Sequence, residues 1–164
     1  MIVTFRIDER LIHGQVIATW LNSLGVTHLI VANDEAAGNQ MQQQLLKMAV
    51  PAKVKCLIKS VDDVKRILKD PRCEKMRIML IVGKPEDAIP LLEDVKEIGE
   101  VNLANYGSIT KPDVPDKLVI SPMVCLDDSD IEVVNRIIEF GKPVFTQKTP
   151  VEQKKNLKKI EKGN

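Results

Sequence analysis

Two kinds of segment alternate along the chain: short apolar runs, and longer stretches in which apolar residues recur every three or four positions. The short runs are typical of buried strands and predict them at residues 2–7, 28–32, 54–58, 77–82, 101–104, 117–120, 123–126 and 143–146. The periodic stretches, together with their capping residues, predict helices at residues 15–24, 34–48, 60–69, 84–98, 127–140 and 150–164.

This alternation, with short connections, favours a parallel sheet. We therefore predict an α/β fold, a single domain over residues 1–164 with an open, mostly parallel sheet of about seven strands and helices on both faces. In such a sheet, ligands bind outside the carboxyl ends of the strands. The loops after the first, second and fifth predicted strands are therefore the places to look for function.

Candidate chemistry gathers in the loop after the first predicted strand. His13 lies at the turn into the next helix and is followed by Gly14, which lets the backbone approach a ligand closely. Free N–H groups at the start of that helix suit an anion. Arg6 and Arg10 flank the turn, and guanidinium matches phosphate oxygens well. Asp8 could accept a hydrogen bond from one ring nitrogen and leave the other nucleophilic.

These residues suit the transfer of a phosphoryl group to and from a histidine, because such catalysis depends mainly on positioning and on stabilising charge. Each of them also has a plainer interpretation. A loop histidine is often a surface or structural residue, and an arginine and an aspartate close in sequence often form a solvated ion pair contributing less than about 1 kcal/mol. The residues alone leave both interpretations open.

Composition and charge exclude several classes. A formal net charge of +1 and only 3% aromatic residues argue against nucleic acid as a partner. Neither of the two glycine-rich motifs of nucleotide-binding loops, G-x-G-x-x-G and G-x-x-x-x-G-K-[ST], occurs in the sequence. The widely spaced Cys56, Cys73 and Cys125 predict free thiols and no metal site. With no secretory leader and no apolar run of membrane-spanning length, we expect a cytoplasmic protein.

The carboxy-terminal residues have a charge pattern of their own. Residues 147–164 contain six lysines and two glutamates, a local net charge of +4. On the predicted final helix this pattern fits a solvated face, with cations favoured near the helix end. It also fits electrostatic attraction to an acidic partner or to a membrane complex.

The first loop resembles the active site of a known family. The run from Arg6 to Val16, Arg-Ile-Asp-Glu-Arg-Leu-Ile-His-Gly-Gln-Val, strongly resembles the active-site segment of the IIB components of the mannose/fructose/sorbose family of the bacterial phosphoenolpyruvate-dependent sugar phosphotransferase system. Similarity at residues 31–35, 84–87 and 101–103 extends the resemblance over most of the chain.

The resemblance implies roles for individual residues. His13 would carry the phosphoryl group on its ring Nδ1, Arg10 would stabilise that group, and Asp8 would orient the site. The other positions that would line the site are Arg6, Gly14, Gln15 and Asp34. The resemblance implies no metal and no cofactor besides the covalent phosphoryl group on His13.

The resemblance also implies partners. A IIA protein or domain would donate the phosphoryl group from its own phosphohistidine, and a sugar imported through membrane IIC and IID components would accept it. The protein would then associate peripherally with the membrane complex. The loop over residues 105–115 departs from the family pattern, since it is rich in proline and has a single glycine, Gly107.

Two alternatives use the same residues. One is a histidine-dependent phosphatase, and the other is a non-catalytic regulator that binds phosphorylated partners. A phosphatase of this kind uses a second histidine, and the only other histidine, His28, falls inside a predicted strand.

Overall fold

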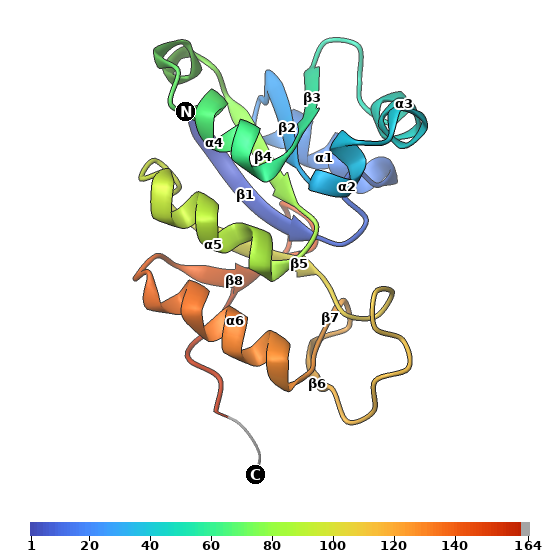
Figure 1. Cartoon of the computed structure of the whole chain (residues 1–164), viewed down its shortest axis with the longest axis vertical. Helices are drawn as coiled ribbons and strands as arrows, with labels where there is room; N and C mark the ends of the chain where they lie inside the picture. The colour runs from blue at the N-terminus through green and yellow to red at the C-terminus, as the bar shows by residue number, and fades with distance from the viewer. Residues whose placement is uncertain (162–164) are drawn as a thin grey trace.

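A seven-stranded sheet forms the centre of the computed structural model, which describes residues 1–161 (Figure 1). The strand order is β3-β2-β4-β1-β5-β8-β9, and only the β8–β9 pair is antiparallel. The strands of this sheet are β1 (Ile2–Asp8), β2 (His28–Ala32), β3 (Lys55–Lys59), β4 (Ile78–Val82), β5 (Val101–Asn105), β8 (Val144–Thr146) and β9 (Lys155–Asn156). The predicted α/β fold with a mostly parallel sheet is thus confirmed.

Helices cover both faces of the sheet. They are α1 (Gly14–Ser23), α2 (Asp34–Ala37), α3 (Gln40–Met48), α4 (Val61–Leu68), α5 (Pro85–Asp94) and α6 (Asp128–Glu139), with a 3-10 helix at Pro71–Lys75. Successive side chains of β2 alternate between the faces: Ile30 joins the apolar cluster of α4, α5 and α6, whereas Leu29 and Val31 join that of α1. Within residues 1–161, no helix is long and apolar enough to cross a membrane.

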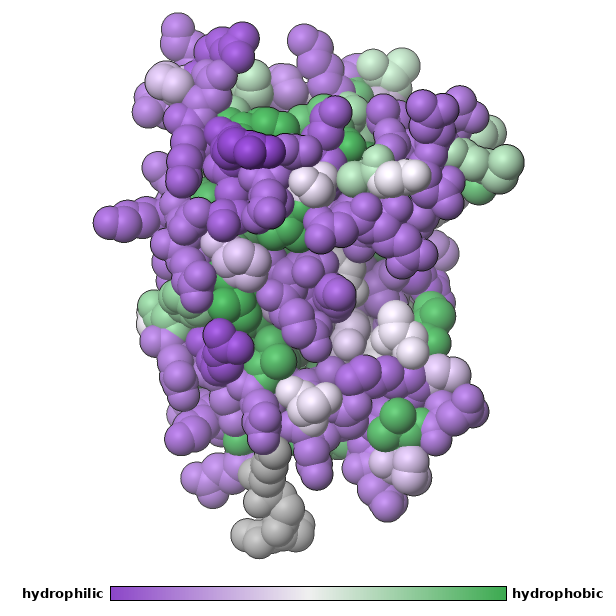
Figure 2. Space-filling model, in the orientation of Figure 1, coloured by the Kyte–Doolittle hydropathy of each residue, from purple (hydrophilic) through white to green (hydrophobic). Residues whose placement is uncertain are grey.

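The predicted helix over residues 34–48 is divided in two. α2 ends at Gly38, and α3 starts after Asn39, whose side-chain oxygen accepts a hydrogen bond from the N–H of Gln42 at 3.0 Å. Such a cap satisfies a free N–H of a new helix and so favours a fresh start over continuation. The second helix leaves three apolar side chains exposed: Met41, Leu45 and Met48. Green atoms of both shades lie at the upper right of Figure 2, where this helix lies.

The strands predicted at residues 117–120 and 123–126 both form, but outside the main sheet. β6 (Leu118–Ser121) and β7 (Val124–Leu126) pair antiparallel as a separate two-stranded sheet. Tyr106, just after β5, forms an isolated bridge with Val124. We call residues 106–126 the β6–β7 lobe. Because β1 and β5 are parallel neighbours, the lobe emerges at the same edge of the sheet as the loop after β1.

The predicted helix over residues 150–164 is wrong within the described part of the chain. Residues 155–156 form β9 instead, paired with β8, and Leu157 continues this pairing through its N–H to the Val144 carbonyl (2.8 Å). The free edge of β8 offers backbone N–H and C=O groups to the terminal segment. The local sequence pattern on which the helix prediction rests contains no information about this edge. Lys162, the last lysine of the cluster, lies outside the described residues.

The helix predicted over residues 84–98 ends early, at Asp94. Val95 and Ile98 are buried in the core while the chain turns towards β5. Their apolar side chains continue the periodic pattern, but they reach the core from irregular backbone and not from a further turn of helix. The difference leaves the carboxyl edge of the sheet, and the loops there, unchanged.

Candidate functional site

The loop after β1 buries two apolar side chains and exposes two polar ones. Leu11 and Ile12 are buried, whereas Arg10 and His13 are exposed. Leu11 has a φ of 60°, a left-handed conformation that a residue with a Cβ seldom adopts. Such strain persists only where the surrounding structure holds it, and it concentrates at functional sites. The loop is therefore held in one shape that points Arg10 and His13 outward.

His13 occupies the N-cap position of α1 without capping it. Its backbone is extended (φ −138°) and its side chain accepts no hydrogen bond from the first turn. Gly14, the first residue of the helix, has a φ of +51°, which glycine adopts without steric cost. The imidazole and the first N–H groups of α1 are therefore both available to an anion.

The Arg10 guanidinium contacts the His13 ring directly. Arg10 Nη1 lies 2.7 Å from His13 Nε2. Since arginine only donates hydrogen bonds, Nε2 is the acceptor, and the proton of the neutral ring is then on Nδ1. A cation therefore already lies beside the ring, on its Nε2 side.

Asp8 and Arg6 form a buried ion pair behind the loop. Arg6 donates from Nε and Nη2 to Asp8 Oδ2 at 3.2 and 3.1 Å, and its guanidinium carbon lies 5.8 Å from the centre of the Trp20 ring. Burial raises the pKa of Asp8 and lowers that of Arg6, and the attraction between the two charges opposes both shifts. The pair is thus enclosed and supports the site from behind.

The expected hydrogen bond from His13 to Asp8 is not formed within the described chain. Asp8 Oδ1 instead accepts from the backbone N–H of Arg10 at 3.0 Å. Both carboxylate oxygens are therefore occupied by arginine groups, so Asp8 acts on the site by fixing the backbone of Arg10. Its orienting effect on His13 is indirect.

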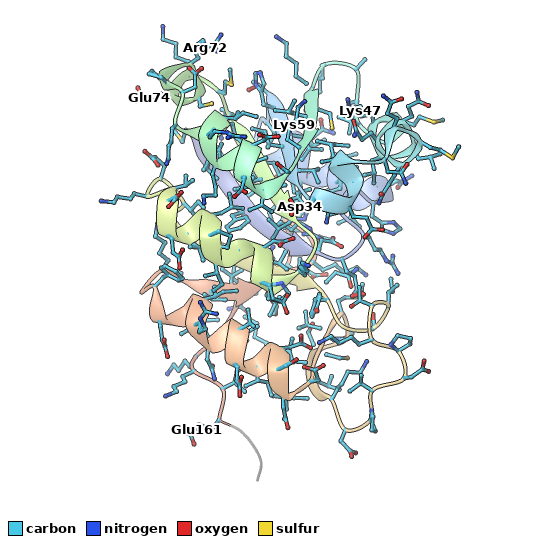
Figure 3. All side chains as sticks on the ribbon, viewed as in Figure 1. Asp34, Lys47, Lys59, Arg72, Glu74 and Glu161 are labelled. Carbon is cyan, nitrogen blue, oxygen red and sulfur yellow. The ribbon has the colours of Figure 1, made fainter. Side chains whose placement is uncertain are left out.

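Two other expected site residues make hydrogen bonds with groups other than the histidine. Gln15 is exposed in the first turn of α1, and its carbonyl accepts from Thr19 Oγ1 at 2.9 Å. Asp34 follows β2, which β4 separates from β1, and its Oδ1 accepts from the N–H of Val61 at 2.9 Å (Figure 3). Asp34 thus holds the first N–H of α4, whose N-cap is Ser60, and no hydrogen bond or ion pair joins it to His13 among the described residues.

The second histidine lies at the amino-terminal end of its strand, the opposite end of the sheet from the loop of His13. His28 begins β2, and its Nδ1 lies 2.8 Å from Thr27 Oγ1. Burial and the positive charge of Lys55 lower its pKa. Because β1 and β2 run in the same direction, the start of β2 and the loop after β1 are at opposite ends of the strands. His28 therefore cannot assist His13.

No feature of the sequence indicates a role for Glu9. Its Oε1 accepts hydrogen bonds from the N–H groups of Ile109 and Thr110, at 2.8 and 2.9 Å, across about a hundred residues of chain. An acid between Asp8 and Arg10 looks like one more member of a charged run, and only the folded chain shows its partners. The proline-rich loop that departs from the family pattern is thereby joined to the loop of His13.

The chain is similar to a family of known proteins over nearly its whole length. Residues 2–164 match the family model described as PTS system sorbose subfamily IIB component. The chain is 37% identical to a probable phosphotransferase enzyme IIB component of Streptococcus pyogenes serotype M6, covering 98% of this chain and 99% of that protein. It is 31% identical to the N-acetylgalactosamine-specific phosphotransferase enzyme IIB component 2 of Escherichia coli K12, covering 97% and 98%.

Solved structures agree with these relatives. The crystal structure of the N-acetylgalactosamine-specific IIB component 1 of Escherichia coli superposes with a TM-score of 0.83 at 28% identity, covering 96% of this chain and all of that one. The IIB domain of the sorbose permease of Klebsiella pneumoniae superposes with a TM-score of 0.84 at 22% identity, covering 95% and 93%, and shows the same fold.

Proposed function

The chain belongs to the sorbose subfamily of IIB components of the phosphotransferase system and is a phosphotransferase, and we propose that it carries the phosphoryl group on His13. The observation that carries this proposal is the contact between Arg10 Nη1 and His13 Nε2 at 2.7 Å, on an exposed ring at the start of a helix. A nucleophile, a cation and helix N–H groups meet at one point of the surface.

We propose that Nδ1 attacks the phosphorus of a phosphohistidine on the donor protein. The donor's N–P bond breaks as the bond from Nδ1 to phosphorus forms, so the phosphoryl group moves with no other co-reactant. The proton that Arg10 holds on Nδ1 must leave first, and it passes to Nε2 through solvent. Arg10 then loses its acceptor on the ring and becomes available to the phosphoryl oxygens.

The second step returns the ring to its unphosphorylated form. A sugar hydroxyl attacks the phosphorus, the Nδ1–P bond breaks, and the hydroxyl proton is released as the sugar phosphate forms. The charge developing on the phosphoryl oxygens is stabilised by Arg10 and by the first N–H groups of α1. First-turn acidic residues, which would repel a phosphate, do not occur in α1.

The partners follow from this chemistry and from the family. We propose that the donor is a IIA protein or domain, and that the acceptor sugar is held by membrane IIC and IID components with which the protein associates peripherally. The similarity to the mannose-specific EIIAB component of Escherichia coli K12, 29% identical over 91% of this chain but only 45% of that protein, supports a close relation to an A component. The only group attached during turnover would be the covalent phosphoryl group.

Incubation with phosphoenolpyruvate, the general phosphotransferase enzymes and a cognate IIA protein tests the proposal. The wild type should acquire acid-labile phosphate, His13→Ala should acquire none, and the matched control His28→Ala should be labelled like the wild type. Label on His13→Ala would overturn the assignment. An unlabelled wild type that hydrolyses phosphomonoesters would instead identify a phosphatase, and one that does neither would fit a non-catalytic regulator.

A further inference from the structure

Two ion pairs join the β6–β7 lobe to the start of α6. Lys111 Nζ lies 2.7 Å from Asp127 Oδ2 and 2.9 Å from Asp130 Oδ1, at the amino-terminal end of the helix. Burial alone would raise the pKa of Asp127, but hydrogen bonds from Lys111, Ser129 and the Asp130 backbone outweigh burial and hold it well below its usual range. The carboxylate thus stays charged, and the ion pairs hold Lys111 of the lobe at the start of α6.

A second lysine forms hydrogen bonds within the lobe. Lys117 Nζ donates to the carbonyl oxygens of Gly107 and Lys111, at 2.6 and 2.5 Å. At Gly107 the lobe comes so close to the backbone of Cys125 that a Cβ would lie 1.7 Å from its carbonyl oxygen. Proline-rich as it is, the segment between β5 and β6 therefore has a definite shape.

Glu9 joins this lobe to the loop that carries His13. Its Oε1 accepts from the N–H groups of Ile109 and Thr110, and its own N–H donates to the Asn105 carbonyl at 2.9 Å. The next residue is Arg10, whose N–H is held by Asp8. The backbone that leads to the Arg10 guanidinium is therefore fixed from the lobe on one side and from the buried ion pair on the other.

The remaining oxygen of Glu9 adds a cost to this arrangement. Glu9 Oε2 is buried without a hydrogen-bond partner among the described residues. A desolvated, unpaired carboxylate oxygen costs free energy, and such atoms in native proteins require an explanation. Glu9 thus holds the two N–H groups of the lobe in spite of this cost.

We propose that Glu9 is a positioning residue for phosphoryl transfer, which keeps Arg10 at His13 by holding their loop against the β6–β7 lobe. This inference rests on the proposed role of His13. We call the hydrogen bonds from the Ile109 and Thr110 N–H groups to Glu9 Oε1 the latch. Loss of the latch would leave the fold intact but would let the Arg10 guanidinium sample positions away from the ring. Because misplacement by about 1 Å can cost on the order of a hundredfold in rate, even partial freedom slows transfer.

The test compares Glu9→Ala, Glu9→Gln and a control, Asp113→Ala, an exposed acid on the same lobe that takes no part in the latch. Transfer from phosphorylated IIA protein is measured over a range of donor concentrations. We expect Glu9→Ala to lower the saturating rate about tenfold with a change of less than about twofold in the half-saturating donor concentration. Glu9→Gln, which keeps an acceptor oxygen, should recover most of the rate, and Asp113→Ala should match the wild type.

Amide hydrogen exchange gives a readout that does not depend on transfer. In Glu9→Ala the Ile109 and Thr110 amides should exchange about tenfold faster, while core amides keep their protection. A saturating rate within about twofold of the wild type would overturn the positioning role, and so would weaker donor binding at an unchanged saturating rate. An unlabelled wild type would overturn the proposed function itself, whereas loss of rate in Glu9→Ala alone identifies the latch.

Discussion

Arg10 determines which nitrogen of His13 carries the ring proton. Its guanidinium donates to Nε2 at 2.7 Å, so the neutral ring is held as the Nδ1–H tautomer. The same side chain that stabilises the resting ring therefore keeps the proposed attachment atom protonated. The contact has to break before Nδ1 attacks, which links the chemistry to the arrival of a donor that draws Arg10 towards its phosphoryl group.

Replacement of Arg10 tests this dual role. Arg10→Ala should keep the fold yet slow transfer to His13 by about tenfold or more, because a charge-assisted contact to the phosphoryl group is lost. In ¹⁵N NMR spectra of the unphosphorylated variant, the preference for Nδ1–H should weaken. Arg72→Ala, an exposed arginine in the 3-10 helix, is the matched control. An unchanged transfer rate would show that Arg10 is a bystander.

At single residues, the structure decides which near neighbours along the chain make contact. His13 and Arg10 are three residues apart in one loop, and they do meet. Asp8 was expected at the ring but faces Arg6, because the alternation of β1 puts both side chains on the same face of the sheet. The distinction between two nearby partners is a matter of about an ångström, which spacing along a chain does not resolve.

Among the elements, the β6–β7 lobe depends most on one residue. Gly107 has a φ of +98° and lies against the backbone of Cys125, so both its conformation and its surroundings exclude a side chain. Gly107 stands where the chain leaves β5 and turns into the lobe.

Gly107→Ala should therefore destabilise the protein severely, by about 3 kcal/mol or more, because backbone atoms must shift to admit the methyl group. Gly141→Ala is the control that measures the cost of a positive φ without a steric clash. Gly141 has a φ of +80°, and nothing lies within 4 Å of its Cβ position. We expect that control to cost only about 1–2 kcal/mol. Urea denaturation measures both, and equal losses would show that the Cys125 contact does not matter.

Element boundaries followed capping chemistry where the caps were visible in the sequence. The capping box of α6, in which the Asp127 and Asp130 side chains each accept from the other's backbone N–H, stands where the acidic run predicted a helix start. The break at Gly38 and Asn39 was missed, because a helical spacing of apolar residues continued through it. Capping depends on residues close in sequence. Whether a helix continues also depends on the tertiary packing of its apolar face.

At the scale of the whole molecule, the two edges of the sheet are closed in different ways. The β8 edge is covered by the carboxy-terminal segment, while the outer strand at the other edge, β3, carries Lys55 and Lys59 at its ends. Lysines at a strand edge discourage pairing with another chain. Part of the lysine-rich terminus is likewise engaged, since Lys154 pairs with Glu100 at 2.9 Å.

Asn135 on α6 is the main polar clamp on the terminal segment. Its side-chain amide donates to the Ile160 carbonyl at 2.8 Å and accepts from the Ile160 N–H at 2.7 Å. Asn135→Ala should loosen residues 157–161, so that limited proteolysis there becomes about tenfold faster while transfer to His13 is unchanged. Arg136→Ala, on the same helix, is the control. Unaltered cleavage would show that the packing of Leu157 and Ile160 holds the segment by itself.

The sequence by itself determined the fold class and the reactive loop of this protein. Hydrophobic periodicity is a local property that reports secondary structure, and His13 and Arg10 share one short loop. Only the tertiary structure decided that Glu9 holds Ile109 and Thr110, that Asp8 faces Arg6, and that residues 155–156 form a strand. These contacts depend on where distant backbone groups come to lie, because hydrogen bonds and sheet pairing are set by ångström-scale geometry that packing alone establishes.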